Sequence, residues 1–143
     1  MSVTMRKFII SPRKPSTQEV RLLSLLIETS TKPILKNWEE GLLVCSLDDG
    51  KMGSLRLLPN GDLLDKVIFG ERVSEFTFVD ADGVDVLASL NLDSLGNLFE
   101  LDLWKSDFSQ LITFPDVDGR RLFTAAERSE NDQRKWGNLK GND

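Results

Sequence analysis

Carboxylates are the side chains in this sequence that could perform acid–base chemistry, and three of them, Glu100, Asp102 and Asp107, lie close together in the chain. A carboxylate pair can act as general acid and base when it lies in a desolvated pocket beside a partner group. The sequence shows the acids but no sign of a pocket. We therefore expect a protein without catalytic residues, and a small enzyme using a carboxylate pair stays as an alternative.

Two features of the composition narrow the chemistry further. The chain has no histidine, and Cys45 is its single cysteine. These counts exclude Ser-His-Asp and Cys-His nucleophile systems, His-containing metal sites, thiolate zinc clusters and an intrachain disulfide. Cys45 follows Leu43 and Val44 in an apolar run, which is typical of a small buried hydrophobic side chain.

Three short segments resemble parts of ion-binding loops. Residues 80–83 and 116–119 combine Asp with Gly, but a calcium-binding loop needs a further ligand, a Glu at its twelfth position and flanking helices. A tight turn explains the 80–83 pattern better, because Asp bonds the local backbone and Gly adopts positive φ. Residues 50–54 lack the order of a phosphate-binding loop and lead into a strand-like segment. We expect no metal and no cofactor.

One amphipathic helix is predicted near the N-terminus, over residues 17–29. Ser16 and Glu19 have the spacing of a capping box, in which a hydroxyl begins the helix and a carboxylate follows three residues later. Pro33 lies beyond the expected end. One face of this helix carries Leu22, Leu23, Leu26 and Ile27.

Beyond residue 40 the sequence consists of short apolar segments separated by turn residues. We expect strands at 42–47, 52–58, 73–79, 84–90 and 98–104, with 63–69 either a strand or an irregular turn. Turn signals every ~8–12 residues favour antiparallel hairpins over parallel βαβ units. The predicted fold class is α+β, an antiparallel sheet of about five or six strands (a meander) with the N-terminal helix packed on one face.

The domain organisation follows from the change of composition near the C-terminus. With 143 residues, the chain has the length of about one domain. We expect residues 1–118 to form a single α+β domain and 119–143 to be a polar segment, either a loosely docked helix or disordered. The apolar stretches of the chain are far shorter than the ~20 residues of a membrane span. The N-terminal residues do not show the pattern of a signal peptide. We expect a cytoplasmic protein that does not associate with a membrane.

Strand alternation predicts which side chains share a face of the sheet. The core face should carry Val84, Val86, Ala88 and Leu90 with Phe99, Leu101 and Leu103. The opposite face should carry Asp85, Leu87 and Ser89 with Leu98, Glu100, Asp102 and Trp104, and Glu75 from the preceding strand. A Trp beside several carboxylates is typical of a binding hot spot for a basic protein.

The charge distribution supports the same interpretation. Residues 41–118 hold five basic against fifteen acidic residues, a net charge of −10, while the whole chain carries −5. Such a field repels nucleic acid and steers basic partners, although the same charge could serve solubility alone. The predicted partner-binding residues are Glu75, Asp85, Glu100, Asp102, Trp104 and Asp107. In the alternative arrangement the C-terminal segment covers Trp104, and Lys105 or tail arginines pair with the acids.

The segment 98–109, LFELDLWKSDFS, carries the most distinctive residues of the chain, together with DADGV at 80–84 and SLN at 89–91. With these motifs the sequence resembles an uncharacterised bacterial family of small single-domain proteins, over about residues 17–115. The resemblance implies no activity and no catalytic residues. In size, charge and their pattern of short segments separated by turn residues, such proteins are similar to immunity proteins encoded beside bacterial polymorphic or contact-dependent toxins.

The function expected from these observations is that of a non-enzymatic binding protein. Its most concrete form is an immunity protein that occludes a basic toxin domain, a nuclease being one candidate, through the acidic face. Nucleic acid and membranes are not expected as partners, and the sequence leaves the oligomeric state open. The alternatives are the carboxylate enzyme already named and a structural or regulatory subunit.

Overall fold

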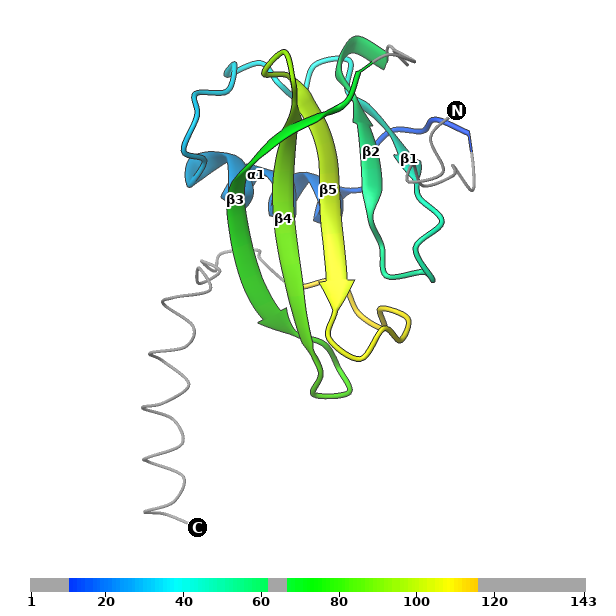
Figure 1. The fold of residues 1–143 in the computed structure, drawn as a ribbon. Coiled ribbons are helices and arrows are strands. Elements are labelled where there is room, and N and C mark those ends of the chain that lie inside the picture. Colours follow the sequence, from blue (N-terminus) through cyan, green and yellow to red (C-terminus); the bar gives the residue numbers. More distant parts are fainter. Residues whose placement is uncertain (1–10, 62–66, 116–143) are drawn as a thin grey trace.

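The computed structural model describes residues 11–61 and 67–115 (Figure 1). The predicted C-terminal segment 119–143 therefore lies outside the described residues, as does most of 63–69. The elements are α1 (Thr17–Glu28), β1 (Leu43–Ser46), β2 (Leu55–Leu58), the short 3₁₀ turn η1 (Pro59–Gly61), β3 (Phe69–Val79), β4 (Asp85–Asp93) and β5 (Leu98–Lys105). Within the described residues, no helix is long and apolar enough to cross a membrane.

The predicted capping box begins α1. The Ser16 hydroxyl accepts the Glu19 backbone N–H at 3.1 Å, and the Glu19 carboxylate accepts the Ser16 N–H at 2.8 Å. The Glu19 carboxylate also accepts hydrogen bonds from both terminal nitrogens of Arg13, at 2.8 and 2.9 Å. These bonds tie the segment before the helix to its first turn. Leu22, Leu23 and Leu26 are fully buried, so the apolar face of α1 packs on the sheet as its spacing predicts.

The sheet is antiparallel throughout, with strand order β1-β2-β5-β4-β3. β3, β4 and β5 form consecutive hairpins, and the β1–β2 hairpin joins them where Leu55 pairs with Leu101. The connection from β2 to β3 therefore leads to the far side of the meander. Figure 1 shows α1 behind one face of this sheet. The predicted fold class, an α+β protein with a five-stranded antiparallel sheet and a helix on one face, is confirmed.

β3 is strongly coiled. Its pairing with β4 has two register irregularities, one between Phe69 and Glu71 and one between Arg72 and Ser74. Figure 1 shows the first half of β3 crossing in front of the upper ends of β4 and β5, on the side away from α1. Gly70 allows this crossing, because a Cβ there would clash with the backbone carbonyl of Asp93.

A bulge in β5 changes the predicted faces at one point. Leu90 pairs with Leu101, whereas Leu92 pairs with Leu98, so Phe99 is an extra residue in the ladder. Leu98 consequently joins the core, although alternation assigned it to the opposite face. Phe99 is also buried but lies outside that core cluster, and the guanidinium of Arg56 lies 4.2 Å from its ring centroid. The prediction for Leu98 was therefore wrong, and Phe99 does not pack in the core cluster as predicted.

Val84 precedes β4, is only partly buried and lies outside the core, so its prediction was wrong. The rest of the core follows the predicted alternation. Val86, Ala88 and Leu90 of β4 are fully buried, and Leu101 and Leu103 of β5 are at most 1% exposed. Burying one such Leu or Val side chain contributes about 1.5–3 kcal/mol, so this layer, together with α1, fixes the sheet that presents the opposite face.

Candidate functional site

The face of the sheet opposite α1, here called the outer face, carries most of the predicted site. Cross-strand pairing places side chains in rows, with Cβ atoms about 4.5–5.5 Å apart. The rows are Thr77, Leu87 and Trp104; Glu75, Ser89 and Asp102; and Arg72, Asn91 and Glu100, the last facing Arg56 of β2. The register therefore brings Glu75, Glu100, Asp102 and Trp104 together on one surface.

The other two predicted residues lie at its margin. Asp85 is the exposed first residue of β4 and pairs with Val79 at the end of β3. Asp107 lies in the loop after β5, where its carboxylate accepts the backbone N–H of Ser109 at 3.0 Å and its hydroxyl at 2.6 Å. These two bonds lower the pKa of Asp107. Asp107 thus shapes its own loop, and Asp85 extends the acidic surface beyond Trp104.

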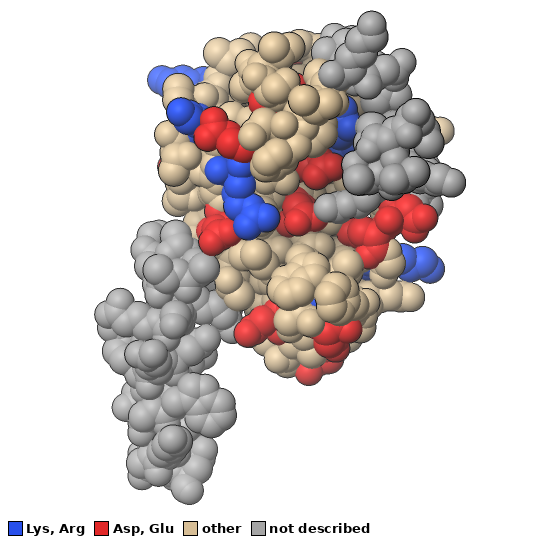
Figure 2. All heavy atoms as spheres, viewed as in Figure 1, with Lys and Arg blue, Asp and Glu red and all other residues tan. Residues whose placement is uncertain are grey.

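Two arginines share the outer face with the acids. Arg72 donates to Glu75 at 3.2 Å, and burial lowers the pKa of Arg56 while the charges of Glu100 and Asp93 oppose that effect. Figure 2 shows acidic and basic side chains adjoining across the middle of this face. The sequence analysis did not place either arginine here, and the surface is mixed in charge where the acids are densest.

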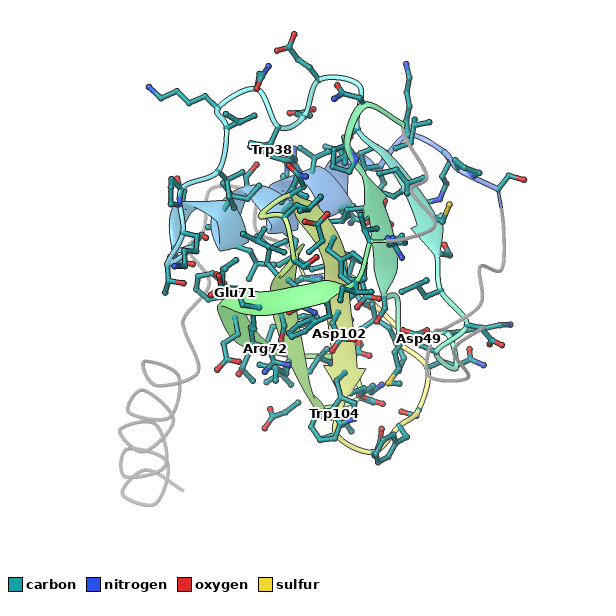
Figure 3. All side chains as sticks on the ribbon, turned by 45° about the horizontal axis from the view of Figure 1, so that its top comes forward. Trp38, Asp49, Glu71, Arg72, Asp102 and Trp104 are labelled. Carbon is teal, nitrogen blue, oxygen red and sulfur yellow. The ribbon has the colours of Figure 1, made fainter. Side chains whose placement is uncertain are left out.

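Trp104 is the large apolar side chain at the lower end of the outer face (Figure 3). Its side chain is 42% exposed, and its ring meets the ring of Phe108 edge to face, with centroids 5.6 Å apart. Phe108 is itself 67% exposed and adopts a φ of +63°, which is strained for a bulky residue. The two rings form an open aromatic pair between β5 and the following loop.

Lys105, the last residue of β5, anchors the loop that carries Phe108. Its side chain is fully buried, and its ammonium donates to Asp80 at 2.8 Å, Asp82 at 2.7 Å and the Gln110 carbonyl at 3.0 Å. Burial by itself would lower the pKa of Lys105, but the bonds to both carboxylates raise it. Because Lys105 pairs with Val86 on the core side, it binds the 80–83 turn and not the outer-face acids.

Asp80 completes the anchor. Its carboxylate also accepts the backbone N–H groups of Ala81, Ile112 and Thr113 at 2.7, 2.8 and 2.9 Å. Burial would raise the pKa of Asp80, but the bonds from Lys105 and these N–H groups hold it well below its usual range. The turn at 80–83 therefore binds the ammonium of Lys105 through Asp80 and Asp82. No cluster of three potential metal ligands occurs in residues 11–61 or 67–115.

A separate apolar pocket of about 290 Å³ lies at the other end of the sheet. It is lined by Pro33, Ile34, Leu35 and Trp38 from the loop after α1, Pro59 after β2, and Gly96, Asn97 and Leu98 of the β4–β5 hairpin. Figure 3 shows Trp38 and Trp104 at opposite ends of the molecule. Sequence reasoning missed this pocket because three segments far apart in the chain form it.

Comparison with known proteins adds one finding. Residues 12–115 match the model of the family described as Domain of unknown function (DUF6984). No curated protein and no solved structure matches the chain. The matched range contains α1, all five strands and the loop that Lys105 anchors.

Proposed function

Since the chain belongs to this family, whose description assigns no activity, we propose from its surface that it is a non-enzymatic binding protein for a basic protein. The observation that carries this proposal is the exposed pair of Trp104 and Phe108 beside the carboxylates of the outer face. The kind of protein that fits best is an immunity protein that occludes a toxin domain.

The aromatic pair has the properties of an interface anchor. Trp is enriched among the residues that dominate binding energy, and Trp104 protrudes from a strand whose neighbours are fixed by the core. Phe108 belongs to a loop held by Lys105 and Asp80. Because these bonds order the loop before association, a partner would lose little conformational entropy in binding it.

The charges around the pair favour a basic partner. Asp85 and Asp102 lie on neighbouring strands within about two rows of Trp104, and the segment 41–118 carries a net −10. Complementary charge accelerates association and rejects acidic competitors. In the proposed mechanism the outer face covers the basic groove of a toxin domain, so that its substrate phosphates are excluded.

The setting of the outer-face acids favours contact over acid–base chemistry. Glu75 and Asp102 are half-buried on the sheet surface, which is not the desolvated pocket that acid–base catalysis needs. These features support binding as the role of the acidic residues.

The test uses the protein encoded by the gene next to the one for this chain. We expect co-expression to relieve growth inhibition by that protein, and calorimetry to show a complex. Trp104→Ala should weaken the complex by about 2 kcal/mol, roughly 30-fold, and Asp102→Asn should weaken it less, mainly through slower association. Asp48→Asn, at an exposed position in the β1–β2 turn, is the charge-matched control.

Two results would contradict the proposal. One is that the neighbouring gene product does not bind. The other is a complex whose affinity is the same for wild type, Trp104→Ala and Asp48→Asn.

A further inference from the structure

Two buried polar side chains in the middle of the outer face each carry an oxygen that has no hydrogen-bond partner among the described residues. Ser89 is fully buried and Asn91 is 5% exposed, yet the Ser89 hydroxyl and the Asn91 carboxamide oxygen have no hydrogen-bond partner among the described residues. Buried polar atoms are nearly always satisfied, since an unsatisfied one is costly. Both residues belong to β4, between β3 and β5 on the outer face. Their unsatisfied oxygens at this place point to a ligand.

The surroundings of these two atoms define the chemistry of that ligand. Ser89 lies between Glu75 and Asp102, and Asn91 lies between Arg72 and Glu100. Asp102 already accepts the Ser54 hydroxyl at 3.3 Å, so it supplies charge and is not counted as an open acceptor. The open acceptors are the hydroxyl and carboxamide oxygens. The Glu75 carboxylate accepts a hydrogen bond from Arg72 and becomes available when that arginine moves away, so the three groups together call for a cationic donor.

The spacing distinguishes between the two cationic side chains. Ser89 and Asn91 are two residues apart on one strand, a separation of about 6.8 Å. A hydrogen bond from nitrogen spans about 2.9 Å, so the single nitrogen of a lysine cannot easily reach both oxygens. The guanidinium of arginine carries five N–H donors on a planar fork and can donate to both.

The chain itself contains a guanidinium next to this place. Arg72 lies in the same row as Asn91 and already donates to Glu75 at 3.2 Å. Its side chain is 47% exposed. Figure 3 shows Arg72 and Asp102 over the same region of the sheet. Because Arg72 is exposed and held here by its bond to Glu75, an arginine side chain of another protein can replace it.

We propose that Ser89, Asn91 and Glu75 form a seat for an arginine side chain of the partner, which displaces Arg72 from Glu75 and donates to the two unpartnered oxygens. This rests on the proposed function, since it names the side chain by which the basic partner enters the outer face.

The seat is tested on the full chain without any partner protein. The probe is N-acetyl-arginine amide, with N-acetyl-lysine amide as its comparison, titrated while amide chemical shifts are followed by NMR. We expect saturable shifts at Ser89 and Asn91 with a Kd on the order of 1–10 mM for arginine, and binding about tenfold weaker for lysine. Ser89→Ala should reduce arginine affinity about tenfold without lowering the unfolding midpoint, because its hydroxyl has no hydrogen-bond partner in residues 11–61 and 67–115.

A second variant keeps the test decisive if Ser89→Ala folds poorly. Arg72→Gln changes an exposed side chain and should raise arginine affinity severalfold by removing the internal competitor. The control is again Asp48→Asn, which should bind as wild type does. The seat is refuted if arginine and lysine bind equally, if the affinity is unchanged in both variants, or if the shifts occur only around Trp104.

The two proposals fail separately. A partner protein that needs Trp104 but binds Ser89→Ala and wild type equally overturns the seat and leaves the binding function standing. Arginine binding at Ser89 with no complex from the neighbouring gene product overturns the function and leaves the seat standing.

Discussion

Replacing Asp80 by Asn tests whether the turn at 80–83 holds the aromatic loop. The carboxylate accepts four hydrogen bonds, one from the ammonium of Lys105 and three from backbone N–H groups. Asn keeps one oxygen, and its NH₂ group would face N–H donors in place of the second oxygen. The substitution also leaves the buried ammonium without one of its two carboxylates.

The expected loss of stability is large because Asp80 is 4% exposed. Removing one partner of a buried ion pair costs about 3–5 kcal/mol, a large part of the 5–15 kcal/mol that is typical of a whole domain. At roughly 3–4 °C for each kcal/mol in a chain of this size, the unfolding temperature should fall by about 10–20 °C.

The assay is urea denaturation followed by circular dichroism, with Asp82→Asn as the matched control. Asp82 bonds the same ammonium at 2.7 Å, but its side chain is 33% exposed, so its replacement should cost at most about 1 kcal/mol. Equal losses for the two variants, or a loss below about 1 kcal/mol for Asp80→Asn, would refute the anchoring role.

The pH dependence of the same anchor has a definite sign. The pKa of Asp80 is lowered by folding, so the unfolded chain binds a proton first as the pH falls. The stability from Asp80 is fully present well above its unfolded pKa of about 3.9. It is lost progressively as the pH drops below about 5 toward the folded pKa. The difference in unfolding free energy between wild type and Asp80→Asn should therefore shrink in acid, and a constant difference from pH 7 to pH 3 would contradict this assignment.

Three further predictions concern the scaffold. Gly70→Ala should cost about 1–3 kcal/mol in urea denaturation, because its Cβ would clash with the Asp93 carbonyl; a neutral result would contradict the close crossing of β3. Burial raises the pKa of the Cys45 thiol, so a thiol reagent should modify it far more slowly in the folded protein than in urea, and equal rates would show that it is accessible. Glu19→Gln should lower stability by about 1–2 kcal/mol in a thermal melt, since two Arg13 bonds lose their charged acceptor; an unchanged melting temperature would exclude that contribution.

The elements that the sequence predicts correctly depend on local signals. The capping residues Ser16 and Glu19 are three positions apart, and each hairpin contains its own turn residues, so α1 and the strands can be identified without knowledge of the tertiary fold. The alternation of Val86, Ala88 and Leu90 likewise reports the buried face of β4 directly. These features needed only neighbours in the chain.

The features that could not be predicted depend on distant parts of the chain. Asp80 and Lys105 are 25 residues apart, and their pairing follows from the register of β4 and β5. The bulge at Phe99 interrupts alternation without a turn residue to mark it. Arg72 belongs to the sheet because β3 begins at Phe69, whereas the predicted strand began at residue 73. A charge count over 41–118 includes this arginine but cannot show that it lies among the outer-face acids.

The coiling of β3 has a consequence for self-association. β3 is the last strand on its side of the sheet, and a straight last strand is a template to which a second molecule can add by backbone hydrogen bonding, the first step toward fibrils. The two irregularities in β3 bend that template, and Glu71 and Arg72 place opposite charges along it. An incoming strand would meet an interrupted ladder, which disfavours backbone pairing with a second molecule along this edge.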